Sequence, residues 1–481
     1  MLWQDAIHTA LSLDNGQPKV ISDHAGILLH DSFTGYLQEH GISFQLCHTV
    51  ADMLPLSNQA EPQIILTTIE KVPAFICNDR ECKSFHFKDL PINGDAYKTL
   101  NQFSTEQVIQ LLEVVYLTDR HTPINQSNID TLLAKANRLQ SEKQFNALLE
   151  QLNQLTEEEP GINGLTEASS IIGQLNYLSY ASSTAIEHEV YEKIDQWSKP
   201  FFVQNGMEQV FYASTPKRPL SVDKIIPHLK ANKHEKVALL CLDCMGFTEW
   251  NLLKAHLELD ESTWDEKAVF AMLPSVTSIS RMAIYEGKRE VYNHKAPGRA
   301  AEAKALANNF APKHTTYLTE SDAITADKLL GYDVVSILYN FFDELAHAVQ
   351  FPPGIEDKTP YLNAAKDYLQ KSSIKQVIQL LKEEGYAVFL CSDHGSIVAK
   401  GNGKRIEKYL IDGFAKRAVI IQADNSELLD MEQINIPFEN DKKVVLPEGR
   451  TMFTYKDKIE VNHGGITLEE MIVPFIKLNW C

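Results

Sequence analysis

One hydrophobic run, from Tyr386 to Cys391, ends abruptly at Asp393, His394 and Gly395. A run of apolar and aromatic residues that stops at such a cluster is typical of a buried parallel strand with a ligand crevice at its carboxyl end. Asp and His both bind metals, and glycine lets the backbone turn sharply as it leaves the sheet. An ordinary strand-to-loop turn has a similar composition, so the weight of this motif depends on whether the pattern recurs.

The pattern does recur in the carboxyl-terminal half of the chain. Three more hydrophobic runs end at polar residues: Val237–Leu242 before Asp243, Ala268–Leu273 before Pro274-Ser275-Val276-Thr277, and Asp333–Tyr339 before Asp343 and His347. A further histidine lies in Asn462-His463-Gly464-Gly465. Open α/β sheets bind ligands at the carboxyl ends of their strands. The recurrence therefore predicts a polar site at one edge of a sheet.

The spacing of these residues favours metal binding. Asp343 and His347 are four residues apart, so on a helix they share a face with Cβ atoms about 5–6 Å apart. Asp393 and His394 are adjacent, which suits a chain that has just left a strand. His463 precedes two glycines, as a ligand on a tight loop would. Three imidazoles and three carboxylates suit Zn²⁺ or Mn²⁺ better than Mg²⁺, and six ligands plus a hydroxyl predict two divalent ions, with Zn²⁺ preferred.

Composition limits the class of protein. The chain has 481 residues, is 44% hydrophobic and carries a formal net charge of −19. Its length predicts two to four domains, and its charge argues against broad binding to long duplex nucleic acid. The first residues lack a basic start, and no apolar run approaches the roughly 18 residues of a membrane span. We therefore expect a cytoplasmic protein without a membrane partner.

The seven cysteines are scattered and odd in number, which argues against a disulfide framework and favours a reducing compartment. Cys241 and Cys244 form a C-x-x-C motif inside an apolar run, and we interpret them as small core residues. Cys77, Cys82 and His86 lack an evident fourth ligand, so we do not expect a metal site there.

Three domains are expected along the chain. Residues 1–103 contain three short strand patterns alternating with helical ones, which predicts a small parallel α/β domain of receiver or flavodoxin type. A capping-box pattern, Ser104-Thr105-Glu106-Gln107, opens a run of helical patterns. Residues 104–235 are therefore expected to form an all-helical domain and linker, a surface for protein partners or a homodimer. Residues 236–481 form the expected α/β catalytic domain.

Over roughly residues 236–481, these motifs resemble the alkaline phosphatase superfamily, and more closely its PglZ-domain branch. The resemblance rests on the strand-end aspartate, the Pro-Ser-Val-Thr segment, Phe-Asp-Glu-Leu-Ala-His, Ser-Asp-His-Gly, and the carboxyl-terminal Asn-His-Gly-Gly-Ile-Thr-Leu-Glu-Glu-Met-Ile-Val-Pro-Phe. It implies a doubly wound, alkaline-phosphatase-like sheet. It also implies two metal sites, one formed by Asp343, His347 and His463, and the other by Asp243, Asp393, His394 and Thr277.

The resemblance further implies a two-metal phosphodiesterase with Thr277 as nucleophile, forming a transient phosphothreonine that water hydrolyses. The expected substrate is a small anionic nucleotide-type phosphodiester, cyclic or a short oligonucleotide, used in signalling or phage defence. Arg281, one helical turn after Thr277, is predicted to hold phosphate oxygens, and a surface or packing arginine is the equal alternative.

Two other functions remain open from the sequence. One is a phosphomonoesterase or phosphomutase with the same metals. The other is a structural subunit of a bacterial BREX-type defence complex. The small number of basic phosphate clamps favours a diester, which carries one negative charge fewer than a monoester. The complete ligand set counts against a purely structural role, because polar groups without a function are costly to bury.

Overall fold

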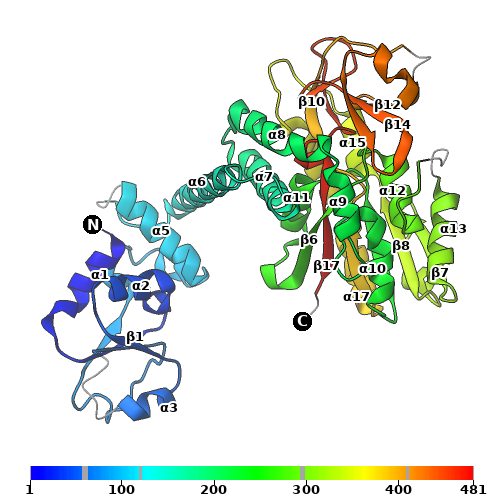
Figure 1. The fold of residues 1–481 in the computed structure, drawn as a ribbon. Coiled ribbons are helices and arrows are strands. Elements are labelled where there is room, and N and C mark those ends of the chain that lie inside the picture. The colour runs from blue at the N-terminus through cyan, green and yellow to red at the C-terminus, as the bar shows by residue number, and fades with distance from the viewer. Residues whose placement is uncertain (1, 57–62, 119–121, 293–297, 408–410, 480–481) are drawn as a thin grey trace. The chain divides into compact units, whose positions relative to one another are not determined.

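The computed structural model describes residues 2–56, 63–118, 122–292, 298–407 and 411–479. It divides the chain into two compact units, Met1–Gln144 and Phe145–Cys481 (Figure 1). Each unit has a hydrophobic core of its own. Helix α6 (Ile129–Leu155) runs across the division between them.

The first unit is built on a four-stranded parallel sheet with the strand order β2-β3-β1-β4. The three expected strands are present as β1, β2 and β3, and the structure contains a fourth strand, β4, that was not predicted. This order differs from the 2-1-3-4-5 order of flavodoxin-like sheets. The alternation of strand and helix patterns along the sequence predicts where strands form but not which strands pair. The remaining elements of this unit are α1 (Trp3–Leu11), β1 (Lys19–Asp23), α2 (Asp31–Glu39), β2 (Phe44–Cys47), α3 (Val50–Met53), β3 (Ile64–Thr67), β4 (Glu81–Phe85), α4 (Tyr97–Leu100) and α5 (Thr105–Thr118).

The predicted capping box at the start of α5 is present. The backbone N–H of Gln107 donates to the hydroxyl of Ser104 over 3.2 Å, and the backbone N–H of Ser104 donates to the amide oxygen of Gln107 over 2.9 Å. These reciprocal bonds satisfy two donors that a helix start would otherwise leave unpaired.

One pair of cysteines differs from expectation. Cys77 and Cys82 are joined by a disulfide in the first unit, a single local link that the odd number and scattered positions of the cysteines did not predict. The two cysteines are five residues apart, and this spacing is equally compatible with a local disulfide and with two free thiols. Cys241 and Cys244 are free and buried, as interpreted from their apolar surroundings.

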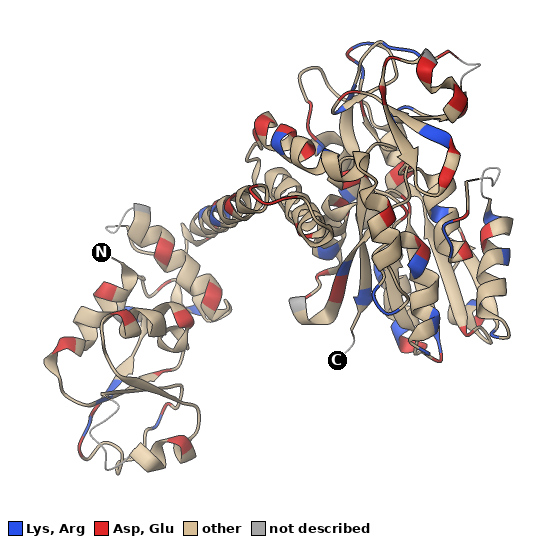
Figure 2. Cartoon of the chain, in the orientation of Figure 1, with Lys and Arg blue, Asp and Glu red and all other residues tan. Residues whose placement is uncertain are grey.

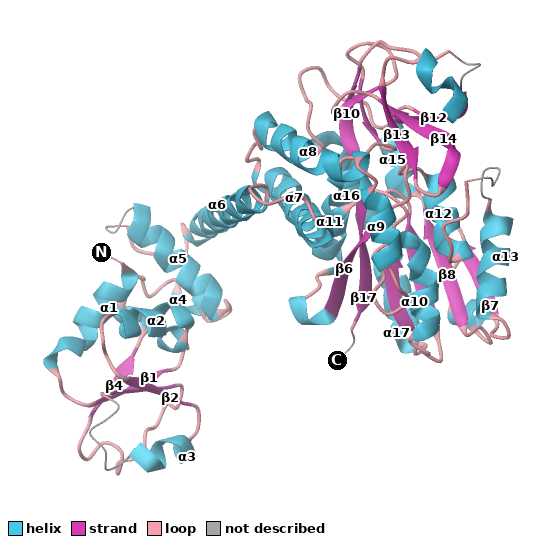
Figure 3. Ribbon diagram, in the orientation of Figure 1, coloured by secondary structure: helices cyan, strands magenta, loops and turns pink. Residues whose placement is uncertain are grey.

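The second unit contains the expected alkaline-phosphatase-like α/β architecture, preceded by helices (Figure 3). Its first part comprises α7 (Ile162–Ser182), α8 (His188–Val203), α9 (Gly206–Ala213), α10 (Ile225–Ala231), β5 (Val237–Leu242), α11 (Phe247–Leu257), β6 (Trp264–Phe270), α12 (Thr277–Glu286), α13 (Arg299–Phe310), β7 (Thr315–Thr319), α14 (Ala326–Leu329), β8 (Val334–Tyr339), α15 (Phe341–Ala348), α16 (Thr359–Lys371) and α17 (Ile374–Glu383).

The rest of the unit returns to strands. These are β9 (Ala387–Cys391), β10 (Ile397–Gly401), β11 (Ile411–Ala415), β12 (Ala418–Gln422), β13 (Glu432–Ile436), β14 (Glu439–Leu446), β15 (Thr451–Met452), β16 (Ile459–Asn462) and β17 (Ile472–Leu478), with α18 (Leu468–Met471) before β17. Strands β11 to β14 form an antiparallel sheet, and β10, β15 and β16 form a second small sheet.

The main sheet has six strands in the order β6-β17-β9-β5-β8-β7. Strands β9, β5, β8 and β7 run parallel, and β17 runs antiparallel to both β9 and β6. Every residue of β5 and β8 is buried, as expected for parallel strands covered on both faces. Consequently the carboxyl ends of β5, β8 and β9 lie at one edge of the sheet.

Helix α7, from the helical region before the sheet, packs closely on α11. A Cβ atom placed on Gly173 of α7 would lie 2.2 Å from the Cβ of Phe247, a distance that real side chains do not reach. Glycine therefore permits this close approach of the two helices. The buried residues of α7 and of the main sheet belong to one continuous core, so this part of the helical region folds with the α/β unit.

Charged residues of both signs are spread along helices such as α8 and α13 (Figure 2). Among the residues that the structure describes, every helix is too short or too polar to cross a bilayer.

Candidate functional site

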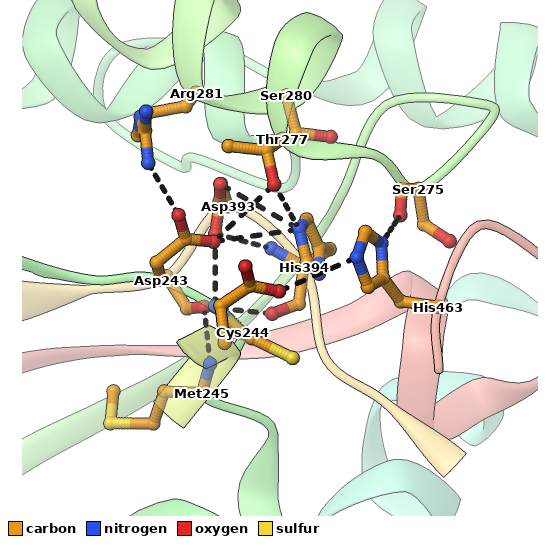
Figure 4. Close-up of polar contacts among 12 residues, drawn as sticks. Asp243, Cys244, Met245, Ser275, Thr277, Ser280, Arg281, Asp393, His394 and His463 are labelled. Atoms are coloured by element: carbon orange, nitrogen blue, oxygen red, sulfur yellow. Dashed lines mark hydrogen bonds and ion pairs between the residues drawn. The ribbon is translucent and has the colours of Figure 1, made fainter. Parts of the chain in front are cut away.

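The predicted polar residues converge at the carboxyl ends of the central strands. Asp243 directly follows β5, and Asp393 and His394 follow β9 by two and three residues. Thr277 is the first residue of α12, and Asp343 and His347 lie on α15, which begins two residues after β8. His463 follows β16 of the small sheet. Figure 4 shows side chains from these segments pointing toward one another.

One group consists of Asp243, Asp393 and His394. Their ligand atoms lie within 4.8 Å of one another, and all three residues are buried. The hydroxyl of Thr277 lies 2.9 Å from Nε2 of His394 and 3.4 Å from Oδ1 of Asp243. The structure therefore places the hydroxyl predicted as nucleophile against the group of ligands that the resemblance implies for it.

The second group consists of Asp343, His347 and His463, again with ligand atoms within 4.8 Å of one another. Nε2 of His347 lies 3.4 Å and Nε2 of His463 lies 3.5 Å from Oδ1 of Asp343. His463 is buried whereas His347 is exposed. The site thus opens toward solvent on the side of α15.

The two groups adjoin through their histidines. The rings of His394 and His463 stack with centroids 3.9 Å apart and an interplanar angle of 15°. Nδ1 of His394 lies 3.1 Å from the carbonyl oxygen of Gly395, and Nδ1 of His463 lies 3.2 Å from that of Ser275. A carbonyl only accepts, so in both rings Nδ1 carries the proton and Nε2 presents a lone pair to the site.

The acidic groups of the site are close enough to perturb one another. Burial, followed by the neighbouring carboxylate of Asp393, raises the pKa of Asp243 well above its usual value. Burial, reinforced by the neighbouring His463, lowers the pKa of His394 to about 4. Burial also disfavours a charge on Asp343, but without a metal ion the protonated forms of the nearby His347 and His463 imidazoles outweigh it and hold the pKa of Asp343 well below its usual value.

Arg281 lies at the edge of the first group rather than free in the crevice. Its Nη1 donates to Oδ2 of Asp243, and its Nε donates to Glu302 over 2.8 Å. Glu302 is fully buried and also accepts a hydrogen bond from the hydroxyl of Tyr317. Arg281 therefore pairs with two carboxylates, and its contact with phosphate oxygens stays a prediction.

Ser275 is a residue of the site that its sequence position did not identify. It is fully buried, its hydroxyl donates to the carbonyl of Gly465 over 2.9 Å, and its own carbonyl faces Nδ1 of His463. The only sign of this role in the sequence is that Ser275 lies two residues before Thr277, in the segment that leads into α12. Ser275 thus joins the loop of the nucleophile to the loop of His463.

The donors of the site fit divalent cations. Oδ1 of Asp343 and Oδ2 of Asp393 are buried and accept no hydrogen bond from any described residue. Buried carboxylate oxygens without partners are costly, and a bound cation would satisfy both. Three carboxylates and three imidazoles with inward Nε2 atoms match the nitrogen and oxygen preference of Zn²⁺ and Mn²⁺. These six residues, together with Thr277, are the ones that would hold the ions.

A comparison with known protein families identifies the region that carries the site. Residues 221–478 match the model of the BREX system PglZ alkaline phosphatase-like domain. Part of the chain is similar to two solved structures, murine ectonucleotide pyrophosphatase/phosphodiesterase 5 (12% identity, 51% of this chain and 88% of that chain, TM-score 0.34) and its human counterpart (11% identity, 51% and 87%, TM-score 0.35). No curated protein matches the chain. Because the family model spans more than half of its residues, the chain belongs to the PglZ family of the alkaline phosphatase superfamily, a superfamily of metal-dependent phosphoesterases.

Proposed function

We propose that this protein is a two-metal phosphodiesterase that hydrolyses a nucleotide-type phosphodiester through Thr277. The observation that carries the proposal is the position of the Thr277 hydroxyl, 2.9 Å from Nε2 of His394 and 3.4 Å from Oδ1 of Asp243. At this position the hydroxyl would share a bound ion with these two ligands, and coordination to an ion is one way in which a nucleophilic hydroxyl is activated.

The N-terminus of α12 supports the same role. Thr277 is the first residue of this ten-residue helix, and a helix N-terminus carries partial positive charge that favours phosphate. The phosphate of a bound diester would therefore be attracted to the atom that attacks it. Thr277 is half-buried and the following Ser278 is exposed, so the threonine faces the cluster while the serine faces solvent.

Divalent ions held by the two groups would supply positive charge that lowers the pKa of the hydroxyl and offsets charge developing on the phosphate. In the proposed reaction, the Thr277 oxygen forms a bond to phosphorus as the bond to the leaving oxygen breaks; the hydroxyl proton passes to solvent, and the departing alkoxide takes up a proton from solvent to leave as an alcohol. Water then cleaves the phosphothreonine, which releases a phosphomonoester and restores the hydroxyl. Arg281 keeps Asp243 oriented toward Thr277 during both steps.

The test is hydrolysis of bis(p-nitrophenyl) phosphate by protein loaded with zinc or manganese. We expect turnover by the wild type, its loss in Thr277→Ala, and near-normal turnover in the matched control Ser278→Ala, whose side chain is exposed. Equal turnover by wild type and Thr277→Ala would overturn the assignment of the nucleophile.

The monoester p-nitrophenyl phosphate distinguishes the second candidate, a phosphomonoesterase or phosphomutase. Faster turnover of this monoester than of the diester would favour that candidate. A fully metal-loaded wild type without activity on either substrate would favour a structural subunit of a defence complex, the role that the BREX name of the family supports. If the diester is preferred, cyclic dinucleotides and short oligonucleotides are the next substrates to compare.

A further inference from the structure

A buried arginine and glutamate lie directly behind the turn that follows His463. Arg417, in the turn between β11 and β12, is 2% exposed, and Glu470, on α18, is fully buried. Nε and Nη2 of Arg417 donate to the two carboxylate oxygens of Glu470 over 2.9 and 2.7 Å. Nη1 of Arg417 donates to the carbonyls of Gly449 and Thr451. All three nitrogens of the guanidinium thus donate hydrogen bonds, and the two parallel bonds to Glu470 hold the pair in one geometry.

The carboxylate of Glu470 also holds the turn of His463. It accepts the backbone N–H of Gly465 over 2.8 Å and the hydroxyl of Thr467 over 2.8 Å. Burial opposes the charge on Glu470, but Arg417 outweighs it and keeps the pKa of Glu470 below its usual value. An ionised carboxylate accepts these hydrogen bonds more strongly than a neutral one would.

Gly465 lies between this pair and the loop of the nucleophile. A Cβ atom at Gly465 would lie 2.6 Å from Nη2 of Arg417 and 2.8 Å from Oε2 of Glu470. The backbone of Gly465 therefore packs directly against this two-bond arginine–glutamate pair, here called the fork. The carbonyl of Gly465 accepts the hydroxyl of Ser275 over 2.9 Å, and the carbonyl of Ser275 faces Nδ1 of His463 at 3.2 Å. A continuous set of contacts therefore leads from Arg417 to the ring of His463.

We propose that Arg417 is a positioning residue for His463: through Glu470, Gly465 and Ser275, it fixes the orientation of the ring and keeps the proton on Nδ1, so that Nε2 faces the metal site. The inference rests on the proposed function only in treating this cluster as a metal site. Groups that orient a metal-binding histidine typically contribute about 10- to 100-fold to metal affinity. We expect a loss of that size, confined to one of the two ions, when the fork is removed.

Arg450 provides a matched control. It lies 19 residues before Glu469, the neighbour of Glu470 in sequence, and donates through Nη1 to Oε1 and through Nη2 to Oε2 of Glu469 over 2.9 and 3.1 Å. It also donates through Nε to Asp195 on α8 over 2.9 Å. Its side-chain partners therefore lead to a helix rather than to His463. Its removal should destabilise the fold by a similar mechanism while the metal site stays intact.

The experiment measures zinc affinity by competition with a chelating dye in the full-length wild type, Arg417→Lys, Arg417→Met and Arg450→Met, and thermal unfolding in EDTA. We expect both methionine variants to melt at lower temperature, but only Arg417→Met to bind one zinc ion about 10- to 100-fold more weakly. Arg417→Lys keeps the charge without the fork and should fall between this variant and the wild type.

Unchanged zinc affinity in Arg417→Met, or an equal loss in Arg450→Met, would overturn the proposal. If Arg417→Met does not fold, Thr467→Val replaces it: this change deletes one hydrogen bond to Glu470, and zinc affinity equal to that of the wild type would overturn the inference. A wild type that binds no zinc overturns it as well. A wild type that binds zinc without hydrolysing any diester contradicts the proposed function alone.

Discussion

Nη1 of Arg281 donates to Oδ2 of Asp243, the carboxylate that ends the central strand of the main sheet. The same guanidinium donates to Glu302, which is fully buried. Two carboxylates at this depth repel one another unless a cation lies between them. Arg281 is that cation, so its contribution to stability does not depend on substrate or metal.

Replacing Arg281 by leucine should therefore destabilise even the metal-free protein. It leaves Glu302 with only the hydroxyl of Tyr317 as a side-chain partner among the described residues, and breaking a buried ion pair in this way costs about 3–5 kcal/mol. The measurement is urea unfolding in EDTA. Arg299→Leu is the control, because Arg299 pairs with Asp322 at the surface and such pairs contribute about 0–1 kcal/mol. Equal effects of the two variants would contradict this account.

Replacing His463 by alanine should remove bound metal and the stability that metal adds. A ligand at about 100 times its dissociation constant stabilises a fold by about 2.7 kcal/mol, so the rise in melting temperature on adding zinc should shrink in the variant. Metal content by mass spectrometry provides the direct measurement. His188→Ala removes a histidine on α8 that pairs with Glu192 and should retain full metal content. Full metal content in His463→Ala would remove His463 from the set of ligands.

Replacing Gly395 by alanine should strain the turn next to His394. The added Cβ would lie 2.0 Å from the carbonyl oxygen of Glu469, a backbone atom that cannot rotate away. Overpacking of this kind costs about 1–3 kcal/mol, and the displaced turn should weaken metal binding as well. Thermal unfolding of the variant, with and without zinc, tests both effects.

The control for this prediction is Gly35→Ala in α2, where nothing lies within 4 Å of the added Cβ. Alanine is favoured over glycine inside a helix, so this change should leave stability equal or slightly higher. A Gly395→Ala protein as stable as Gly35→Ala would show that the backbone around Glu469 adjusts without cost.

Replacing Cys244 by serine should leave metal content and diester hydrolysis nearly unchanged. Cys244 is fully buried, and its Sγ lies 3.9 Å from the carbonyl of Gly395, so the change alters this contact and leaves the candidate metal ligands in place. Its thiol belongs to neither group of candidate ligands. A collapse of bound metal in this variant would show that the C-x-x-C motif contributes a ligand after all.

Sequence predicts the site residues that belong to short local patterns, such as an apolar run with a polar end or a four-residue spacing. Asp243, Asp393 and His394 each follow a continuous apolar run, and the four-residue spacing of Asp343 and His347 places them on one helical face. The parallel sheet then has only one edge at which such residues can meet. For these positions, hydrophobic runs with polar ends predict that the side chains meet, whereas their division into two metal sites came from the family resemblance.

What sequence does not predict depends on contacts between distant segments. Arg417 and Glu470 are 53 residues apart, and neither belongs to a motif that marks the other as its partner. The guanidinium of Arg281 is directed by Glu302, which lies on another helix. The strand order of the first unit has the same origin, because pairing between strands depends on three-dimensional packing that alternation along one strand does not record.

The stacked rings of His394 and His463 have a consequence for the segment between them. The chain leaves the main sheet after β9, just before His394, and rejoins it at β17, after His463. Strands β10 and β16 pair at the base of this excursion, with Ile397 opposite Asn462. A closed loop grows more costly only slowly with length, about 0.6 kcal/mol for each doubling. Residues inserted in this excursion away from the turn of Arg417 would therefore add little to the entropy of closing the loop between the two histidines.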